Sequence, residues 1–483
     1  MGSVLRMKLA ITLLVGIGAT AGATGKDTKL PVTTSSAEAR ALYLEGQDFA
    51  EKLRATDAHA KFAAAVAKDP DFALAYLGMA NSAGTTKEFF DALGHAVALA
   101  GKVSPGEKLL ILSTDQGTKN DLAHQKTSLD QLSKLFPDDE RVANQLGQYY
   151  FNRQDYSNAI ASYEHAIKIN PAFSQPYNQL GYAYRFTDKL ADAERTFKKY
   201  IELIPGDPNP YDSYAELLMQ EGKFDESIAS YNKALAIDGT FIASYIGIGN
   251  DQIFQGHGDD ARASFGKLAK AARSDGERRQ AIFWTAIAYS HEGAWDKALA
   301  EADKLVAIAT AAKDLGNLAN DDNFIGNTLL EAGRPDEAAA KFKLQLETSE
   351  KADLPPEVKE ATRRNGVYDE ARVALAKHDL ATAKAKAAQY GKLVTTKQNP
   401  FEMRQQHALL GMIAIDESKF AVATGELAKA NQRDPRVLYL SAVALAGSGN
   451  AKSAKAMAAR AADFNGLAPN YAYVRSKAKA LAK

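Results

Sequence analysis

Residues 147–171 have the sequence GQYYFNRQDYSNAIASYEHAIKINP, and residues 181–205 have the sequence GYAYRFTDKLADAERTFKKYIELIP. Both stretches start with glycine, end with proline and carry an alanine 12 positions after the glycine, at Ala159 and Ala193. Equivalent positions are 34 residues apart, and Pro137 lies one further period upstream. A fixed period of this length indicates a repeat architecture.

Each unit predicts two amphipathic helices of about a dozen residues, joined by a turn such as Gly222-Lys-Phe-Asp. Gly147 and Gly181 lie in the middle of the first helix, where glycine costs about 1 kcal/mol in helix propensity. The cost is understandable if the glycine lets a partner helix approach. We expect aromatic residues of the second helix to fill the space between units, namely Tyr163, Phe197, Tyr231, Phe265 and Phe342. One unit cannot cover its own apolar face, so neighbouring units must stack.

The same register is present near the N-terminus at Gly46, Phe49, Ala58, Phe62, Ala65 and Pro70. This pattern resembles the tetratricopeptide repeat (TPR). The resemblance implies an all-α protein, an α-α superhelical solenoid of about ten to twelve TPR-like helix pairs. The strongest units span residues 39–72, 140–173, 174–207 and 208–241.

The period changes along the chain. Residues 37–273 form an N-terminal TPR array, residues 274–364 are divergent, and residues 365–483 form a C-terminal TPR-like array with a basic helical cap. Beyond Arg273 the small anchor of the second helix recurs at Ala298, Ala338, Ala383, Ala423 and Ala454, at steps of 40, 45, 40 and 31. Either the helices lengthen or linkers intrude, and we expect interruptions at 312–322 and 353–358.

The first residues indicate export. Arg6 and Lys8 precede an apolar run at 9–17, followed by the small residues of 19–23, which is typical of a signal peptide covering residues 1–23. The alternative, a membrane anchor, needs about 20 apolar residues. We therefore expect a periplasmic or secreted bacterial protein with no integral membrane segment after cleavage. Residues 24–36 predict a polar tether, and Ser35 with Glu38 predicts a capping box.

Composition argues against catalysis and against nucleic acid. Lys plus Arg and Asp plus Glu both number 59, so no net positive charge favours nucleic acid. The chain has no cysteine, which excludes thiolate metal sites and cysteine nucleophiles. His291-Glu292 lacks the second histidine of a zinc helix, and Gly447-Ser-Gly449 fits a turn between helices better than a phosphate loop. We predict a protein that is not an enzyme and needs no cofactor.

In TPR proteins the first helix of each pair lines a concave groove that receives peptides. Carried over by position, this resemblance implies groove residues with many amide side chains, which can donate to and accept from a peptide backbone. They are Asn144, Gln148, Asn152, Asn178, Tyr182, Arg185, Asp212, Glu216 and Asn250. The family's carboxylate clamp is not expected, because Asp212 and Glu216 would repel an anion; a cationic or neutral extended partner fits better.

The C-terminal end is basic. Residues 451–483 carry seven basic residues against Asp463 alone, at Lys452, Lys455, Arg460, Arg475, Lys477, Lys479 and Lys483. They predict a solubilising cap or, alternatively, an anionic contact.

The function implied by the resemblance is a non-enzymatic scaffold or adaptor that binds a protein or peptide partner in the cell envelope. The alternative is a structural spacer or accessory subunit of an envelope machine for polysaccharide or outer-membrane export.

Overall fold

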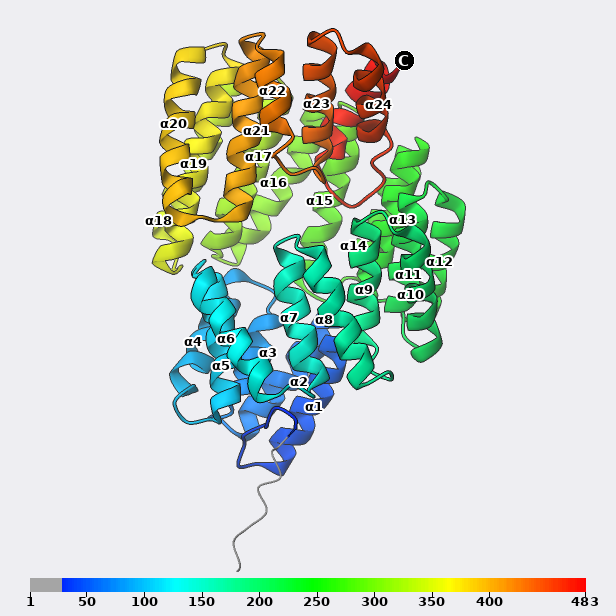
Figure 1. Cartoon of the computed structure of the whole chain (residues 1–483), viewed down its shortest axis with the longest axis vertical. Coiled ribbons are helices and arrows are strands. Elements are labelled where there is room, and N and C mark those ends of the chain that lie inside the picture. The colour runs from blue at the N-terminus through cyan, green and yellow to red at the C-terminus, as the bar shows by residue number, and fades with distance from the viewer. Residues whose placement is uncertain (1–27) are drawn as a thin grey trace, which may run out of the picture.

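A computed structural model describes residues 28–483, and within that range the chain is entirely helical, with 25 α-helices and no strand (Figure 1). The first twelve helices are α1 (Ala37–Glu51), α2 (Ala55–Lys68), α3 (Ala73–Asn81), α4 (Thr86–Leu99), α5 (Pro105–Thr118), α6 (Leu122–Leu135), α7 (Glu140–Asn152), α8 (Tyr156–Ile169), α9 (Gln175–Phe186), α10 (Leu190–Leu203), α11 (Asn209–Gln220) and α12 (Phe224–Ile237).

The remaining helices are α13 (Ile242–Gln255), α14 (Gly258–Ala271), α15 (Asp275–His291), α16 (Trp295–Ala311), α17 (Leu315–Glu331), α18 (Pro335–Lys351), α19 (Pro356–Ala376), α20 (Leu380–Lys397), α21 (Pro400–Asp416), α22 (Phe420–Leu427), α23 (Pro435–Gly447), α24 (Ala451–Ala462) and α25 (Tyr471–Ala482). Consecutive helices pack as twelve antiparallel pairs, with α25 as a final single helix. The predicted all-α array of helix pairs is confirmed.

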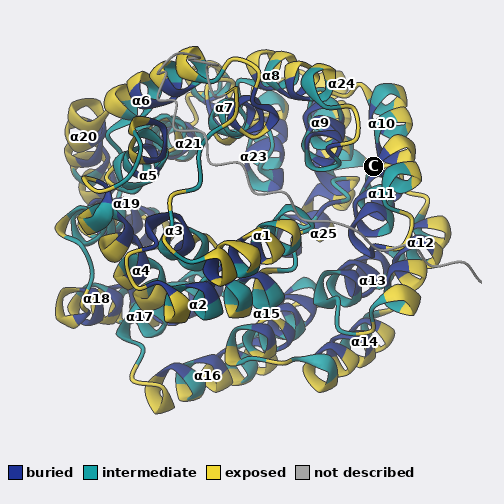
Figure 2. Ribbon diagram, turned by 90° about the horizontal axis from the view of Figure 1, so that it is seen from below, coloured by how far each residue is buried: buried dark blue, intermediate teal, exposed yellow. Residues whose placement is uncertain are grey.

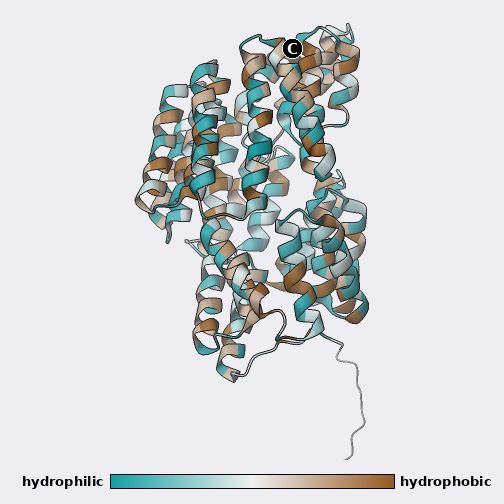
Figure 3. Cartoon of the chain, turned by 90° about the vertical axis from the view of Figure 1, so that its left-hand side faces the viewer, coloured by the Kyte–Doolittle hydropathy of each residue, from teal (hydrophilic) through white to brown (hydrophobic). Residues whose placement is uncertain are grey.

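The small and aromatic positions of the repeat meet as expected. All five predicted aromatic residues are buried, Phe342 at 4% exposure being the most accessible of them. A Cβ atom added to Gly181 would lie 2.5 Å from the ring of Phe197, so only glycine permits this approach of the two helices. Figure 3 shows hydrophilic and hydrophobic residues alternating along the helices, as stacking of amphipathic pairs requires.

The pairs wind into a superhelix whose first helices face inward. Each odd-numbered helix from α1 to α23 packs on its own partner, and many of them also contact the next odd-numbered helix. Seen from below, the helices run around a common axis (Figure 2). The inner, concave surface is therefore built by the odd-numbered helices.

Helices from successive turns of the superhelix touch each other. Thr56 Oγ1 donates to Glu277 Oε1 at 3.1 Å across 221 residues, and Asn399 Nδ2 donates to Asn120 Oδ1 at 3.1 Å across 279 residues. Arg433 Nη1 donates to the carbonyl of Phe186 at 3.0 Å. These contacts join α2, the α5–α6 turn and the end of α9 in the first turn to the N-terminal ends of α15, α21 and α23 in the second turn. We call this line of contacts the seam.

The widened repeat spacing reflects longer helices. Helices α15 to α18 each have 17 residues and α19 has 21, compared with 12 to 14 in α7 to α14. The expected interruption at 312–322 is wrong, because α17 begins at Leu315 and packs on α16 and α18. Residues 353–355 do form a short link, after which Pro356 opens α19.

The part of the expected tether that the structure describes lies against the repeats. Leu30 N donates to Asp139 Oδ2 at 2.7 Å, and Thr33 N donates to Glu107 Oε1 at 2.7 Å. Helix α1 is capped by Ser36, whose hydroxyl accepts from the backbone N–H of Ala39, so the capping box predicted at Ser35 is displaced by one residue and lacks its glutamate partner. The predicted signal peptide, residues 1–23, lies outside the described residues.

Candidate binding groove

The first three predicted groove residues lie on the inner helix α7. Asn144 Nδ2 donates to Gln175 Oε1 at 2.8 Å, and Gln148 Nε2 donates to Asn152 Oδ1 at 2.8 Å. Asn144 and Gln148 line a cavity of about 500 Å³ on the concave face of the first turn. The N-terminal segment lies in the same cavity through Leu30, so this part of the groove already holds an extended stretch of the chain itself.

The next predicted residues, on α9 and α11, bind one another. Tyr182 donates to Glu216 Oε1 at 2.9 Å, and Arg185 Nη1 donates to Glu216 Oε2 at 2.7 Å. Asp212 is buried and accepts from the Ser244 hydroxyl at 2.7 Å. Burial raises the pKa of Asp212 to about 8, and the charge of Glu216 adds to this shift. Asp212 and Glu216 are thus both engaged inside the protein. They do not support the expectation of a cationic partner, which rested on their free negative charge.

Two further predicted residues serve packing. Asn178 is 1% exposed, and its Oδ1 atom is buried without a hydrogen-bond partner. Asn250 accepts at 2.7 Å from the hydroxyl of Tyr471, the first residue of α25. The C-terminal helix packs on α15, α23 and α24, and Tyr471 also contacts the ring of Phe254 at 4.8 Å. The chain therefore fills the inner face near α13 and α15 itself.

The C-terminal basic residues are divided between the interior and the surface. Arg475 is buried and donates to the carbonyl of Phe464 at 3.0 Å, and Lys477 pairs with Glu331 at 3.6 Å. Lys452 and Lys479 are exposed. The helical cap thus also closes the inner face, and the anionic contact stays a prediction.

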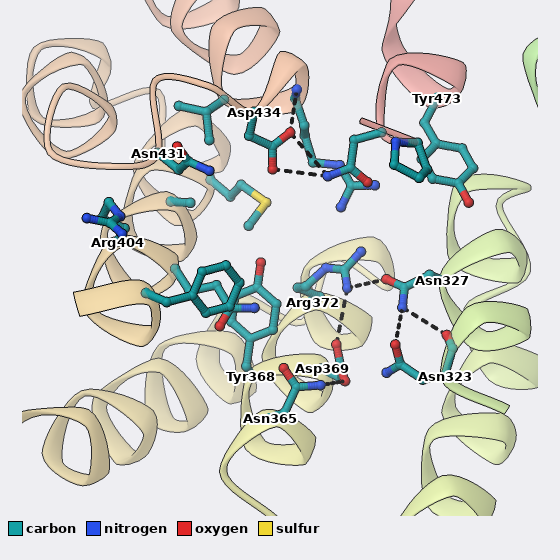
Figure 4. Close-up of a pocket in the computed structure, with 18 of the residues that line it drawn as sticks. Asn323, Asn327, Asn365, Tyr368, Asp369, Arg372, Arg404, Asn431, Asp434 and Tyr473 are labelled. Carbon is teal, nitrogen blue, oxygen red and sulfur yellow. Dashed lines mark hydrogen bonds and ion pairs between the residues drawn. The ribbon is translucent and has the colours of Figure 1, made fainter. Parts of the chain in front are cut away.

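A separate cavity of about 400 Å³ opens on the inner face of the second turn. Its walls come from the inner helices α15, α17, α19, α21 and α23 and from the segment before α25. Figure 4 shows amide, arginine and tyrosine side chains gathered around it. We call this cavity the second-turn groove; its polar lining includes Asn323, Asn327, Asn365, Tyr368, Asp369, Arg372, Arg404, Gln405, Asn431, Asp434, Arg436, Asn470 and Tyr473.

Part of this lining is held rigidly. Arg372 Nη1 donates to Asn327 Oδ1 at 2.7 Å and to Asp369 Oδ1 at 3.1 Å, and Asn365 Nδ2 donates to Asp369 Oδ2 at 2.8 Å (Figure 4). Burial raises the pKa of Asp369 to about 6, although the charge of Arg372 opposes the shift. The Asp369 carboxylate offsets the charge of the Arg372 guanidinium, so this part of the groove carries little net charge. The hydrogen bonds of Asn327 and Asn365 to these two groups hold both amides in position.

Two other groups that line the groove are not part of this network. The Nε atom of Arg404 is buried and has no hydrogen-bond partner. Phe401, at the start of α21, is 58% exposed and lines the same cavity. The groove thus combines fixed amides, an unpaired guanidinium N–H and an exposed aromatic ring, a combination suited to an extended polypeptide.

The repeat register alone contains the signal for the second-turn groove. The predicted groove positions stand three residues before and one residue after the small residue of the first helix, as Asn144 and Gln148 do around Gly147. Around Gly326 the same positions are Asn323 and Asn327. Around Ala371, 12 residues before Ala383, they are Tyr368 and Arg372, and around Gly411 they are Ala408 and Met412; all six line the cavity. The groove residues predicted from the sequence end at Asn250.

Comparison with family models gives repeats in the same places. A TPR repeat model matches residues 132–185, and two tetratricopeptide repeat models match residues 246–313 and residues 174–207 and 209–241. The chain is a tetratricopeptide-repeat protein. The matched units of this TPR protein include three of the four units with the strongest predicted pattern, and none of the models describes a catalytic domain.

Several solved structures resemble parts of this TPR protein. A tetratricopeptide repeat protein from Parabacteroides merdae is 17% identical over 53% of this chain and 97% of its own, with a TM-score of 0.37. MamA from Desulfovibrio magneticus is 16% identical over 36% of this chain and 98% of its own, with a TM-score of 0.30. YrrB, described as a TPR protein with an unusual peptide-binding site, is 15% identical over 37% of this chain and 91% of its own, with a TM-score of 0.26. A search of curated proteins gave no match.

Two features of residues 28–483 bear on other functions. None of the helices described there has the length and apolarity needed to cross a membrane. Nor does that part of the TPR protein bring together three histidine or acidic side chains in a way that would hold a metal ion.

Proposed function

We propose that this TPR protein is a non-enzymatic scaffold that binds an extended segment of a partner protein in the second-turn groove. The observation that carries the proposal is the lining of that groove by amides from three inner helices, with Asn323 and Asn327 on α17, Asn365 on α19 and Gln405 on α21. An extended peptide loses water from its backbone groups on binding, and amides replace both donor and acceptor contacts.

The first-turn groove is the weaker candidate. Leu30 and Val32 line its cavity, and Asn144 and Gln148 already bond to neighbouring side chains. A partner segment entering there would have to displace the N-terminal segment. In the second-turn groove, Phe401 offers an exposed anchor at the edge.

We also propose that the protein works outside the cytoplasm. Support comes from the positively charged start, the short apolar run and the small residues at 19–23, together with the lack of cysteine. Mass spectrometry of the protein purified from cells tests this part: we expect a mature chain that begins near residue 24. Recovery of uncleaved chain from the cytoplasmic fraction alone would refute it.

Binding is tested by affinity capture from the native envelope fraction, comparing wild type with a groove variant, Asn365→Ala with Phe401→Ala. The matched control is Asn232→Ala, an exposed amide on the outer helix α12. We expect a stoichiometric partner with wild type and control, and at least tenfold weaker binding to the groove variant at equal helicity. Unchanged binding to the groove variant would instead favour a spacer that is held through its ends or outer face.

A further inference from the structure

The N-terminal segment is held mainly by acidic side chains of the first turn. We call residues 29–35 the strap; they contain no helix and run past the ends of α2, α5 and α7. These ends present four carboxylates, from Asp69 after α2, Glu107 in the first turn of α5, and Asp139 and Glu140 at the start of α7. We call these four residues the acidic row, and each of them is more than nine-tenths buried.

The backbone of the strap donates to the acidic row at three places. The three N–H donors and their acceptors are Leu30 to Asp139 at 2.7 Å, Thr33 to Glu107 at 2.7 Å and Ser35 to Asp69 at 3.0 Å. Such bonds need a backbone N–H group at the right spacing, and every residue except proline supplies one. The acidic row therefore holds a polypeptide segment through its main chain, whatever side chains the segment carries at these three positions.

Side chains of the strap add selectivity to these main-chain bonds. The ammonium group of Lys29 pairs with Glu140. Leu30 packs so closely on α5 that a Cβ atom added to Gly106 would lie 2.7 Å from its Cδ1 atom. The hydroxyl of Thr34 donates to the last carboxylate of the acidic row at 2.5 Å. The preferred segment thus has a basic residue, then an apolar residue, and a hydroxyl group four positions after the apolar residue.

Contacts within the repeats keep the acidic row in place independently of the strap. The backbone N–H groups that also donate to it are those of Ser104 to Glu107 at 3.0 Å, Val142 to Asp139 at 3.1 Å and Asp71 to Asp69 at 3.1 Å. Within the described residues the strap joins the helices only at Ala37, and its side chains at Lys29, Thr33 and Ser35 are exposed. Another segment can therefore replace the strap without a change in the repeats.

The strap leaves part of the first-turn cavity unused. About 500 Å³ stays open beside Leu30 and Val32. Asn144 lines this space and is 7% exposed, and its Oδ1 atom is buried without a hydrogen-bond partner. A bound segment that continues from the acidic row over the inner face has room to donate to this acceptor, which the strap does not reach.

We infer that the acidic row is a binding site for a basic segment of a partner protein, and that the strap competes with this segment. Among residues 28–483 the cations that pair with the row are Lys29 and Arg141, both at Glu140, so the row keeps an excess of negative charge that complements a basic segment. The inference does not rest on the proposed function, because the acidic row belongs to the first turn and the second-turn groove is a separate cavity.

The test measures binding of a strap peptide to the full mature chain by fluorescence anisotropy. The peptide is acetyl-Lys-Leu-Pro-Val-Thr-Thr-Ser-amide with a fluorescent label. Wild type is compared with a released variant, Lys29→Glu with Leu30→Glu, which sets a carboxylate against Glu140 and removes the apolar contact. The matched control is Lys267→Glu, an exposed lysine on the outer helix α14. Adding Glu140→Gln to the released variant, and glutamine in place of lysine in the peptide, completes a double-mutant cycle.

We expect the peptide to bind the released variant at least tenfold more tightly than wild type or Lys267→Glu, because a tethered strap competes at an effective concentration of about millimolar. Either change of the lysine contact should weaken binding at least fivefold, and the second change should add little to the first. If the released variant does not fold, saturating peptide should instead speed amide hydrogen exchange at Thr33 of wild type at least tenfold.

Three results would overturn the inference. They are equal binding to wild type and the released variant, no binding to either, and independent effects of the two changes at the lysine contact. A wild-type dimer that the peptide dissociates would also contradict it, because the acidic row would then bind the strap of a second copy and not a partner protein.

Discussion

The hydroxyl of Tyr471 donates a 2.7 Å hydrogen bond to the side-chain oxygen of Asn250, joining residues 221 positions apart in the chain. The bond places the first turn of α25 on the inner face of the superhelix, between α13 and α15. The C-terminal helix is therefore a structural part of the concave surface, and its removal should expose that surface.

Replacing Tyr471 by Phe keeps the ring but leaves Asn250 Oδ1 buried without a donor. An unpaired buried acceptor costs about 1 to 3 kcal/mol. We expect a loss of that size in the free energy of unfolding measured by urea denaturation. Tyr245→Phe is the control, because its hydroxyl bond to the carbonyl of Gly239 is exposed and should contribute less. Equal effects of the two substitutions would show that the Asn250 contact is not special.

Two glycine substitutions should have opposite effects. In Gly181→Ala the new methyl group would lie 2.5 Å from the Phe197 ring, and such overpacking costs about 1 to 3 kcal/mol. In Gly266→Ala, on the outer helix α14, the methyl group meets nothing within 4 Å, so the gain in helix propensity of up to about 1 kcal/mol should remain. Midpoints of chemical denaturation measure both effects, and stabilisation by Gly181→Ala would contradict the packing described.

Stability should fall as pH rises from about 4 to 8 because of Asp251. This carboxyl group is fully buried, and burial raises its pKa to about 8. Over that range Asp251 keeps a proton in the folded chain that it releases in the unfolded chain, so this one group lowers the free energy of unfolding by at most about 1.4 kcal/mol per pH unit. Asp251→Asn should make this dependence shallower without abolishing it, because the pKa of buried Asp212 is also raised to about 8, whereas Asp260→Asn, on the surface, should leave it unchanged. The same pH dependence in Asp251→Asn would refute the assignment.

The N-terminal segment should depend on Glu107. This side chain is fully buried and accepts from the backbone N–H of Thr33 at 2.7 Å and of Ser104 at 3.0 Å. Hydrogen bonds to a charged group contribute about 1.5 to 3 kcal/mol each, so Glu107→Gln should speed amide hydrogen exchange at Thr33 by tenfold or more. Glu226→Gln, an exposed change on α12, should leave that exchange rate unchanged. A slow exchange rate at Thr33 in Glu107→Gln would mean that other contacts hold the segment.

Local pattern was enough to predict the helix pairs. The glycine and alanine at 12-residue spacing identify where two helices of a pair touch, and this rule holds from Gly147 with Ala159 to Gly411 with Ala423. The same register, continued past the point where the spacing widens, predicts the second-turn groove. The wider spacing leaves the register of the later repeats ambiguous, because longer helices and inserted linkers both increase the repeat length.

Contacts between turns were not predictable from the sequence. Small rotations from one pair to the next set the pitch of a solenoid, and no residue pattern reports their sum. By its repeat position Asn250 is predicted to line the groove, although in the structure it binds Tyr471. Nothing in the repeat pattern marks Arg433, although it contacts Phe186 and Tyr156 across the seam. Tertiary contacts also explain why Tyr182, Arg185 and Glu216 form a closed network instead of an open surface.

The most direct test of the account is site-specific photo-crosslinking in the native envelope. A photoreactive amino acid replaces Phe401 at the edge of the second-turn groove in one variant and Asn232 on the outer helix α12 in another. We predict one dominant crosslinked partner from position 401, through a single extended segment, and none of that partner from position 232. Crosslinking of the same partner from position 232 but not from position 401 would contradict a binding groove on the inner face.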